Sequence, residues 1–425
     1  MVDFEDVCGE NNACALSGVA CFFMGVTGAV VVVNSPLWCY FNIFKNFEKS
    51  SDSAIFCTNL DNDNMIYGTE ENLLNTLDLV QQTFGDKMQF LCIENNCSVN
   101  LIGDDINGIV KKAGITCNII TLDSGGTKGD FYDGYNMAAQ AFLQQNKFSV
   151  QEPIKYSVNL LGFSEGVGNL RNDFPELIEL LKSFGITVNT CPGYKDSNNL
   201  AEFRRAELNL VIVESLGLKI AEFCEENYNM PYLVVGLPYG ILGTISWLEE
   251  ILTFFNINHL FKTKLSALKM SYSKLSADRL RKVRATWGEL QFPTVVLGGV
   301  SSMIIPLGAC IKNEWVDCVE IYGLIYDGIV SKNNEMNLIN MKTESDEFKK
   351  ILPQLKEGLL LASSNERVLL SNAKIYNVVC KNIMNPNFEE CNLAGKPYVA
   401  FNGSLNLLEE IWNKYIVLKK KSLVV

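Results

Sequence analysis

The chain has 425 residues, 48% of them hydrophobic and 20% charged, so it can form two or three domains with sizeable cores. Its net charge of -12 argues against binding a nucleic-acid backbone, which needs clustered lysine and arginine. The single histidine, His259, leaves no basis for a His-based catalytic triad or a two-histidine metal site within one chain.

Fourteen cysteines are a high count for a chain with no sign of export. Residues 1–6 are acidic and lack a basic n-region, so we expect no signal peptide and a cytoplasmic protein with reduced or metal-bound cysteines. The apolar run at 19–33 is broken by Gly25 and Gly28 and is shorter than the ~20 residues of a membrane helix. It predicts a buried helix followed by a buried strand, and we expect no membrane association.

Short β-branched segments alternate with amphipathic helices along the first third of the chain. The predicted helices cover residues 70–84 and 106–113, and the first has apolar residues at helical spacing. The predicted strands cover residues 29–33, 53–58, 88–93 and 116–121. This β-α alternation indicates a parallel sheet with helices on both faces.

The same pattern restarts near residue 155. The predicted strands of this second repeat cover residues 156–161, 187–189, 208–213 and 232–235. The predicted helices cover residues 174–184, 201–206, 217–228, 244–255 and 260–287. A third repeat opens with a strand at 294–297 and an expected turn at Gly298 and Gly299. We predict an α/β fold of three doubly wound parallel-sheet domains, 1–150, 151–290 and 291–425, the last ending in a C-terminal helix.

Three cysteines, Cys14, Cys39 and Cys97, stand in glycine- or proline-marked apolar settings, and we place them at the ends of predicted strands or in their turns. Open α/β sheets place their sites at this edge, and thiolates from separate turns hold iron–sulfur clusters. Gaps of 24 and 57 residues are too wide for a ferredoxin run or a zinc ribbon. Alternatively, all three are small buried hydrophobes, as we expect for Cys21 and Cys92. The other cysteines have no companion pattern.

Two glycine-marked turns have simpler interpretations. Residues 103–105, Gly-Asp-Asp, predict a helix N-cap rather than a catalytic carboxylate pair, because consecutive carboxylates there point in different directions. Residues 236–240, Gly-Leu-Pro-Tyr-Gly, could line a crevice but lack the Lys-Ser/Thr of a phosphate-binding loop. We find no Walker A sequence or dinucleotide fingerprint, so we expect no ATP or nicotinamide site.

At its three cysteines the chain resembles the nitrogenase component 1 superfamily. Residues 14–20 read Cys-Ala-Leu-Ser-Gly-Val-Ala, similar to the family's cysteine followed by a Leu-x-Gly-Ala-type turn. Residues 31–39 read Val-Val-Val-Asn-Ser-Pro-Leu-Trp-Cys, where the family has a strand ending in a His-Gly-x-x-Gly-Cys-type turn. Residues 95–105 read Asn-Asn-Cys-Ser-Val-Asn-Leu-Ile-Gly-Asp-Asp, similar to the family's Thr-Thr-Cys-x-x-x-Ile-Gly-Asp-Asp.

Further segments extend this likeness. The family's Phe-Gly-Gly-x-x-x-Leu helix start resembles residues 67–73, and its Val-Asn-x-x-Gly strand resembles residues 158–162. Its segment ending in Pro-Tyr resembles residues 206–232. The resemblance covers most of residues 10–255 and fades in the last third. The cysteine spacing is closest to β-type subunits.

The resemblance implies three Rossmann-like domains around a central cleft. It also implies a second component-1-like subunit, identical or homologous, that pairs with this chain so that Cys14, Cys39 and Cys97 hold an iron–sulfur cluster at the interface. That cluster would be a [4Fe-4S] cluster or half of a bridging [8Fe-7S]-type cluster. Electrons would come from a separate ATP-dependent iron protein, which agrees with the missing Walker A sequence.

Two departures from the family limit what this chain can hold. The family's iron–molybdenum cofactor needs a cysteine and a histidine, but residues 210–215 contain no cysteine and His259 lies elsewhere. We therefore expect no iron–molybdenum cofactor in this chain. Asn34, Ser35 and Pro36 replace the family's His and Gly pattern, which leaves the cluster's nuclearity open.

Our hypothesis is an oxidoreductase active only as an anaerobic complex, in which this subunit relays electrons from the iron protein to a substrate or cofactor. The alternatives are a scaffold for metallocofactor assembly, a β-type structural subunit without its own substrate site, and a small-molecule-binding fold with vestigial cysteines. No catalytic residue is identified. The cleft candidates, at predicted strand ends in the second domain, are Glu214, Ser215, Pro238 and Tyr239.

Overall fold

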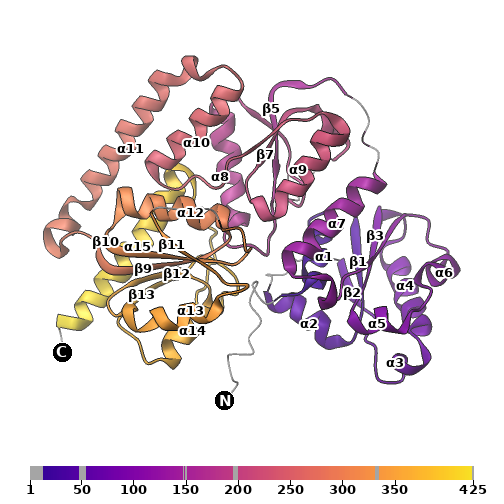
Figure 1. Ribbon diagram of the computed structural model, residues 1–425. Coiled ribbons are helices and arrows are strands. Elements are labelled where there is room, and N and C mark those ends of the chain that lie inside the picture. The colour runs from indigo at the N-terminus through magenta and orange to yellow at the C-terminus, as the bar shows by residue number, and fades with distance from the viewer. Residues whose placement is uncertain are drawn as a thin grey trace.

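Three parallel β-sheets, each with its own helices, follow one another along the chain in the computed structural model (Figure 1). The structure describes residues 13–46, 54–146, 148, 151–194, 200–330 and 335–423. The α/β prediction of three parallel-sheet domains is confirmed. In the described ranges no helix is both long and apolar enough to cross a membrane.

The first sheet has the strand order β2-β1-β3-β4, and its two faces are covered by different helices. Val31 and Cys92 pack with residues of α1 and α7, whereas Val32 and Ile93 pack with residues of α4 and α6. This alternation is what a parallel strand buried on both faces requires. The elements are α1 (Ala15–Met24), β1 (Ala29–Asn34), α2 (Leu37–Asn46), β2 (Ala54–Cys57), α3 (Asn64–Tyr67), α4 (Glu70–Phe84), η3 (Gly85–Lys87), β3 (Phe90–Asn95), α5 (Cys97–Ile102), α6 (Ile106–Ala113), β4 (Asn118–Asp123), η4 (Gly126–Lys128) and α7 (Phe131–Gln145).

The second sheet has the order β6-β5-β7-β8 and is followed by two long helices, α10 and α11. In Figure 1 this unit lies at the top, between the first unit at the right and the third at the lower left. Its elements are β5 (Ile154–Leu161), α8 (Leu170–Ser183), β6 (Thr187–Thr190), η6 (Leu200–Arg205), β7 (Ala206–Val211), α9 (Glu214–Tyr228), β8 (Tyr232–Val234), α10 (Gly240–Phe254) and α11 (Asn258–Trp287).

The third sheet has the order β11-β10-β9-β12-β13, and the chain ends in α15, which packs against β13 and also against α8 and α10 of the second unit. Its elements are β9 (Gln291–Gly299), α12 (Ser301–Cys310), the π-helix η7 (Ile311–Trp315), β10 (Asp317–Ile325), β11 (Asn337–Asn340), α13 (Ser345–Ile351), η8 (Leu352–Leu355), β12 (Leu359–Ala362), α14 (Ser364–Asn372), β13 (Val379–Asn382) and α15 (Ala400–Leu423).

The predicted turn at Gly298 and Gly299 is wrong, because both residues belong to β9 and pair with Leu324 and Ile325. The glycines serve close packing instead. A Cβ added to Gly298 would lie 2.6 Å from the Tyr326 hydroxyl oxygen.

The predicted helices at 70–84 and 106–113 are confirmed as α4 and α6 with the same bounds. The helix predicted at 201–206 is the 3-10 helix η6. The domain boundaries at 150 and 290 stay predictions.

Helices α1 and α7 approach each other so closely that their backbones touch. A Cβ added to Gly18 of α1 would lie 1.9 Å from the Phe131 carbonyl oxygen, and one added to Gly134 of α7 would lie 1.9 Å from the Ala15 carbonyl oxygen. Only glycine permits this contact from either side. The contact fixes the start of α1, where the first of the three predicted cysteines lies.

Candidate functional site

The three predicted cysteines all lie at the edge of the first sheet where its strands end. Cys39 lies in the first turn of α2, directly after β1, and Cys97 is the first residue of α5, directly after β3. Cys14 follows no described strand; it is the N-cap residue of α1. A β-bridge between Cys14 and Asp130 holds it at this edge. The neighbouring residues also pair, because the Phe131 N–H donates to the Ala13 carbonyl at 2.9 Å.

Contacts with neighbouring residues bring the thiols around a shared space. A Cβ added to Gly126 would lie 3.5 Å from Cys14 Cβ and 3.9 Å from Cys97 Sγ, so both cysteines border this glycine. Asn96, the residue before Cys97, donates from Nδ2 to Cys39 Sγ at 3.7 Å. The structure therefore places Cys14, Cys39 and Cys97 at one edge of the sheet, linked through Gly126 and Asn96.

The electrostatics of this site disfavour free thiolates. Burial raises the pKa of the Cys14 and Cys39 thiols, and negative charge at neighbouring cysteines and at Glu94 raises both further. Two backbone N–H groups at the start of α1 oppose the shift at Cys14, and the Asn96 amide opposes it at Cys39. Thiolates here need added positive charge, which bound metal ions supply.

The loop after β4 forms one wall of the site, and the sequence prediction did not include it. A Cβ added to Gly125 would lie 2.7 Å from Cys97 Sγ and 2.5 Å from Cys97 N, so no larger residue fits. The preceding residue, Ser124, donates from Oγ to Glu94 Oε2 at 3.1 Å. The only sequence signal was the Ser-Gly-Gly run after a predicted strand.

Glu94, near the end of β3, was also missed. Its side chain is fully buried, and its Oε1 atom has no hydrogen-bond partner. The signal was a carboxylate in the otherwise apolar run Leu-Cys-Ile-Glu, three residues before Cys97. A buried acidic residue so close to predicted metal ligands is a functional-site candidate.

A fourth thiol, Cys57, lies at the same edge, although its sequence context gave no companion pattern. It ends β2, where its Sγ accepts the Asn59 N–H at 3.3 Å and lies 3.4 Å from the Ser35 carbonyl oxygen. Burial raises the pKa of Cys57, and the charge of Cys39 adds to the shift. The remaining sequence-predicted core cysteines, Cys21 and Cys92, are buried as expected.

The arrangement of these residues is compatible with a polynuclear cluster. Among the residues that the structure describes, no three His, Cys, Asp or Glu side chains converge closely enough to hold one metal ion. In a cluster each thiolate binds a different iron, so the ligands stand apart around a common space. Three cysteines around a glycine wall, with the unpaired Glu94 oxygen nearby, fit that arrangement.

The Gly-Asp-Asp turn performs two structural tasks. Asp105 caps α6 as predicted, accepting the Gly108 N–H at 2.9 Å. Asp104 instead accepts from the backbone N–H and the hydroxyl of Thr69, at 2.6 and 2.7 Å, and so holds the start of α4. The two carboxylates point to different partners, which agrees with their predicted non-catalytic role.

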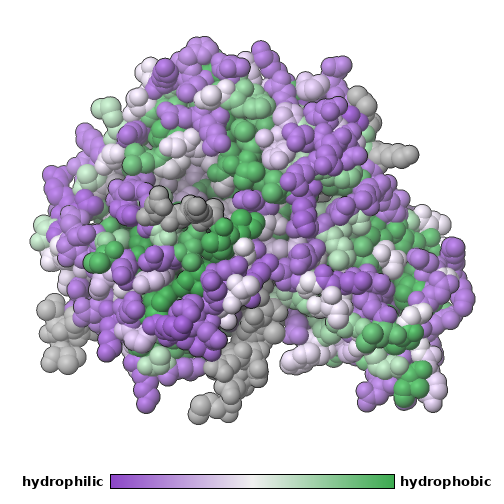
Figure 2. All heavy atoms as spheres, viewed as in Figure 1, coloured by the Kyte–Doolittle hydropathy of each residue, from purple (hydrophilic) through white to green (hydrophobic). Residues whose placement is uncertain are grey.

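Exposed apolar side chains surround the cysteine edge. On α2, which carries Cys39, Trp38 is 73% exposed, and on α5, which carries Cys97, Leu101 is 88% exposed. We call the full set the apolar rim: Leu37, Trp38, Phe41, Ile66, Tyr67 and Leu101. Figure 2 shows hydrophobic side chains gathered at the lower right, over α3 and α5. Exposed apolar patches of this kind mark interaction surfaces.

The cleft candidates divide into two pairs. Glu214 and Ser215 are partly exposed at the start of α9, and burial together with Asp327 raises the pKa of Glu214. Pro238 and Tyr239 are buried, so the expectation that they line an open cleft is wrong. Their turn is covered by the start of α15, where the Ala400 N–H donates to the Pro238 carbonyl at 2.8 Å.

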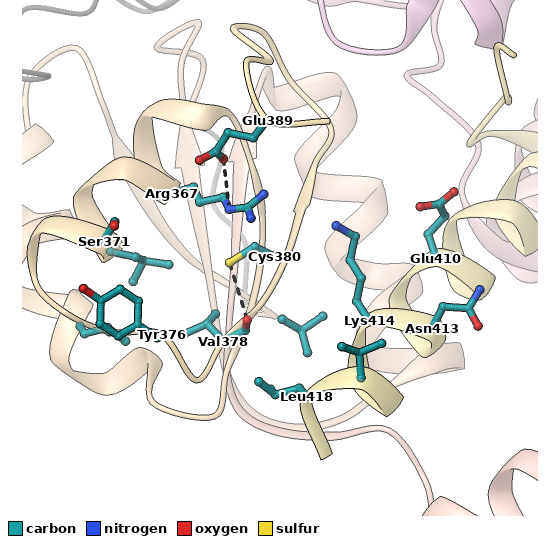
Figure 3. A pocket seen from close by; sticks show the side chains of 14 residues that line it. Arg367, Ser371, Tyr376, Val378, Cys380, Glu389, Glu410, Asn413, Lys414 and Leu418 are labelled. Carbon is teal, nitrogen blue, oxygen red and sulfur yellow. Dashed lines mark hydrogen bonds and ion pairs between the residues drawn. The ribbon is translucent and has the colours of Figure 1, made fainter. Parts of the chain in front are cut away.

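Another hollow, of about 520 Å³, lies in the third unit between α14, β13 and α15 (Figure 3). Its charged groups are paired with each other, for example Arg367 with Glu389 at 3.1 Å. Burial raises the pKa of Cys380, which borders it, to about 11. It shares no residue with the cysteine edge and has no unpaired charge to recognise a ligand.

Comparison with known proteins gives a consistent result. Residues 14–416 match the family described as nitrogenase component 1 type oxidoreductase. The nitrogenase iron-molybdenum cofactor biosynthesis protein NifE of Mesorhizobium japonicum is 24% identical over 94% of this chain and 80% of its own length. A light-independent protochlorophyllide reductase subunit of Prosthecochloris aestuarii is 28% identical over 44% of this chain and 35% of its own length. A solved structure, "Nitrogenase Cp1 at pH 5", superposes with a TM-score of 0.75 at 19% identity, over 95% of this chain and 88% of its own.

Proposed function

This chain belongs to the nitrogenase component 1 type oxidoreductases, and from that premise we propose that it is the cluster-carrying subunit of a nitrogenase-like reductase. Cys14, Cys39 and Cys97 hold an iron–sulfur cluster that receives electrons from an ATP-dependent iron protein. The cluster, when bound, supplies one-electron chemistry at low potential. The protein's part is to orient, desolvate and tune it for delivery to a substrate or cofactor.

The observation that carries this proposal is the meeting of three cysteines from α1, α2 and α5 at one sheet edge. Three separate elements supply them, and Gly125 packs directly against Cys97, where no larger residue fits. Structural cysteines in a core have no need of such an arrangement. The proposal therefore predicts that loss of one thiol releases the bound iron.

A second component-1-like subunit, identical or homologous, completes this proposal. Three thiolates leave part of a cluster without a ligand, and the apolar rim on α2, α3 and α5 surrounds the same edge. Apolar surface that a partner covers explains why Trp38 and Leu101 are exposed here. The partner would supply the remaining ligands and bury the cluster between the subunits.

We propose no iron–molybdenum cofactor in this chain. The segment from Leu210 to Ser215 has no cysteine, and His259 is exposed near the start of α11, away from the first sheet. The cysteine and histidine that such a cofactor needs are therefore not both supplied by this segment.

A scaffold for metallocofactor assembly is the second candidate. It is favoured by the NifE relative, described as a cofactor biosynthesis protein, which aligns along 94% of this chain. A scaffold would hold the same cluster without turnover. The two functions differ in the fate of the cluster, because a relay subunit keeps its iron and sulfur while electrons pass through it, whereas a scaffold transfers iron and sulfur to another protein.

Iron and acid-labile sulfide per chain, after anaerobic purification, test the proposal. We expect about two to four irons per chain in the wild type. Cys39→Ser should lose most of this iron, since serine is a poor ligand for a cluster. Cys117→Ser is the matched control: Cys117 is also partly exposed and in the first unit, but it precedes β4 and so lies at the opposite sheet edge. A folded wild type without iron would reject the proposal.

A further inference from the structure

Glu94 is a fully buried acid with one oxygen atom that nothing in its surroundings satisfies. Oε2 accepts the Ser124 hydroxyl at 3.1 Å, but Oε1 has no hydrogen-bond partner. No lysine or arginine within the described residues forms an ion pair with it. A buried polar atom left unpaired costs about 1–3 kcal/mol, so it needs an explanation, such as a bound group.

The direction of the Glu94 side chain follows from the strand that carries it. Side chains on β3 alternate between faces, so Glu94 shares a face with Cys92, which packs with residues of α1 and α7. Cys14 is the N-cap of α1 on that same face. Its hydrogen bond from Ser124 ties the Glu94 carboxyl group to the loop in which the next residue, Gly125, borders Cys97 Sγ, so the carboxyl group lies beside the cysteine site.

A neutral carboxyl group suits this position and an ionised one does not. An ionised carboxylate here would be fully buried close to the cysteine thiols, with the single hydrogen bond from Ser124 to stabilise its charge. Burial raises the pKa of Glu94 well above its usual range, which favours the protonated form. A protonated carboxyl group can donate one hydrogen bond, which a carboxylate cannot.

We propose that the neutral Glu94 carboxyl group donates a hydrogen bond from its unpaired oxygen to a sulfur of the cluster that the three cysteines hold. This inference rests on the proposed function and adds a residue that tunes it. Hydrogen bonds to sulfur are one means by which proteins set the reduction potential of such clusters. The bond is strongest when the cluster is reduced and more negative, so it raises the potential. Ser124 orients the donor by holding the other oxygen.

The test compares variants that keep or remove the donor. Glu94→Met has a similar length and no hydrogen-bond donor, whereas Glu94→Gln keeps an N–H donor at the same place. Ser124→Ala removes only the orienting hydroxyl group and serves as the second variant if Glu94→Met does not fold. Glu366→Gln is the control, because Glu366 is also buried but bonds to Ser363 in the third unit. Each protein is purified with its cluster, its iron is counted, and its midpoint potential is measured by redox titration followed by electron paramagnetic resonance.

We expect all four variants to retain iron. Glu94→Met should lower the ratio of reduced to oxidised cluster about tenfold at a fixed potential. For a one-electron couple this equals a fall of about 59 mV in the midpoint potential. Glu94→Gln should return the potential to near the wild-type value, Ser124→Ala should shift it downward by less, and Glu366→Gln should not move it.

Three results would overturn the inference. An unchanged potential in Glu94→Met and Ser124→Ala would show that no hydrogen bond was lost. Equal shifts in Glu94→Met and Glu94→Gln would show that the donor is not what matters. Loss of iron in folded Glu94→Gln would make the carboxylate a ligand instead. In each of these three cases, the proposed function would still stand if the wild type contains iron and Cys39→Ser loses it. If the wild type contains no iron, the proposed function and the Glu94 hydrogen bond are both rejected.

Discussion

At the scale of single residues, the cysteine site depends on a missing side chain as much as on the thiols. Gly125 lies against both the backbone and the sulfur of Cys97, so a single methyl group has no space. The contact is with backbone atoms at the start of α5, which cannot move aside as a flexible side chain can. The shape of the site is thus set by atoms that are not ligands.

Gly125→Ala should therefore disturb the site without removing a thiol. We expect at least half of the iron to be lost and the free energy of unfolding to fall by about 1–3 kcal/mol, the usual cost of overpacking. Iron analysis and urea denaturation measure both effects. Gly243→Ala in α10 is the control, because a Cβ there meets nothing within 4 Å and should stabilise the helix by about 0.5–1 kcal/mol. Full iron content and unchanged stability in Gly125→Ala would contradict the description of this wall.

At the scale of elements, α2 and α5 each combine a cysteine in the first turn with large apolar side chains on the surface. Cys39 is flanked by Trp38, and Cys97 begins the helix that carries Leu101. The sheet places both helices after adjacent strands, β1 and β3, so ligand and apolar surface lie at the same edge. One partner surface can therefore cover the apolar rim and close the cysteine site together.

A charge introduced into the apolar rim should weaken subunit association. We expect Trp38→Asp and Leu101→Asp each to raise the dissociation constant at least tenfold, because burying an unpaired carboxylate costs more than about 1.4 kcal/mol. Sedimentation of the protein, alone and with a second component-1-like subunit, measures this change. Leu393→Asp is the matched control, since Leu393 is 96% exposed but lies in the third unit. Association that is as strong in both rim variants as in the control would place the subunit interface elsewhere.

At the scale of the whole molecule, polar contacts join the three units. Lys342 of the third unit forms an ion pair with Asp130, which also caps α7 beside Cys14. Asp173 of α8 is fully buried and accepts the Tyr398 N–H at 2.6 Å, just before α15 begins. Burial raises the pKa of this carboxyl group from 3.8 to about 7, while its hydrogen bonds from backbone N–H groups oppose the shift.

The Asp173 carboxyl group should make stability depend on pH. Between pH 4 and 7 the folded protein keeps a proton on Asp173 that the unfolded chain has lost, so the free energy of unfolding falls as pH rises through about 7. The full effect is up to about 4 kcal/mol. Asp173→Asn cannot ionise and should flatten this part of the dependence, which denaturant melts at pH 5 and pH 8 measure.

Ser404→Ala is the control for Asp173→Asn, because it removes a hydrogen bond from Gly240 N–H to α15 without removing a titratable group. It should lower stability by about 1 kcal/mol at both pH values. If Asp173→Asn kept the full wild-type dependence on pH, the buried carboxyl group would not be its source.

Much of the fold and the three cysteines could be predicted because local patterns encode them. Helix α4 has apolar residues at helical spacing, and the strands β1 and β3 are apolar runs before marked turns. The prediction failed at Gly298 and Gly299, where glycine serves packing between strands and not a turn. It failed at Pro238 and Tyr239 because the distant helix α15 covers their turn. Neither contact is visible from neighbouring residues in the chain.

The alternation of strands and helices, the family resemblance and the three cysteines beside turns can be predicted from the chain alone, because these features depend on residue type and short spacing. The surroundings of those cysteines depend on how the elements pack together. The site is bordered by Glu94 from β3 and by Gly125 and Gly126 from the loop after β4. Their roles depend on burial and on distances across the sheet. The apolar rim, too, became visible only when folding left Trp38 and Leu101 uncovered. Burial and exposure are properties of the packed molecule, so residues of the same type acquire different roles according to where the fold places them.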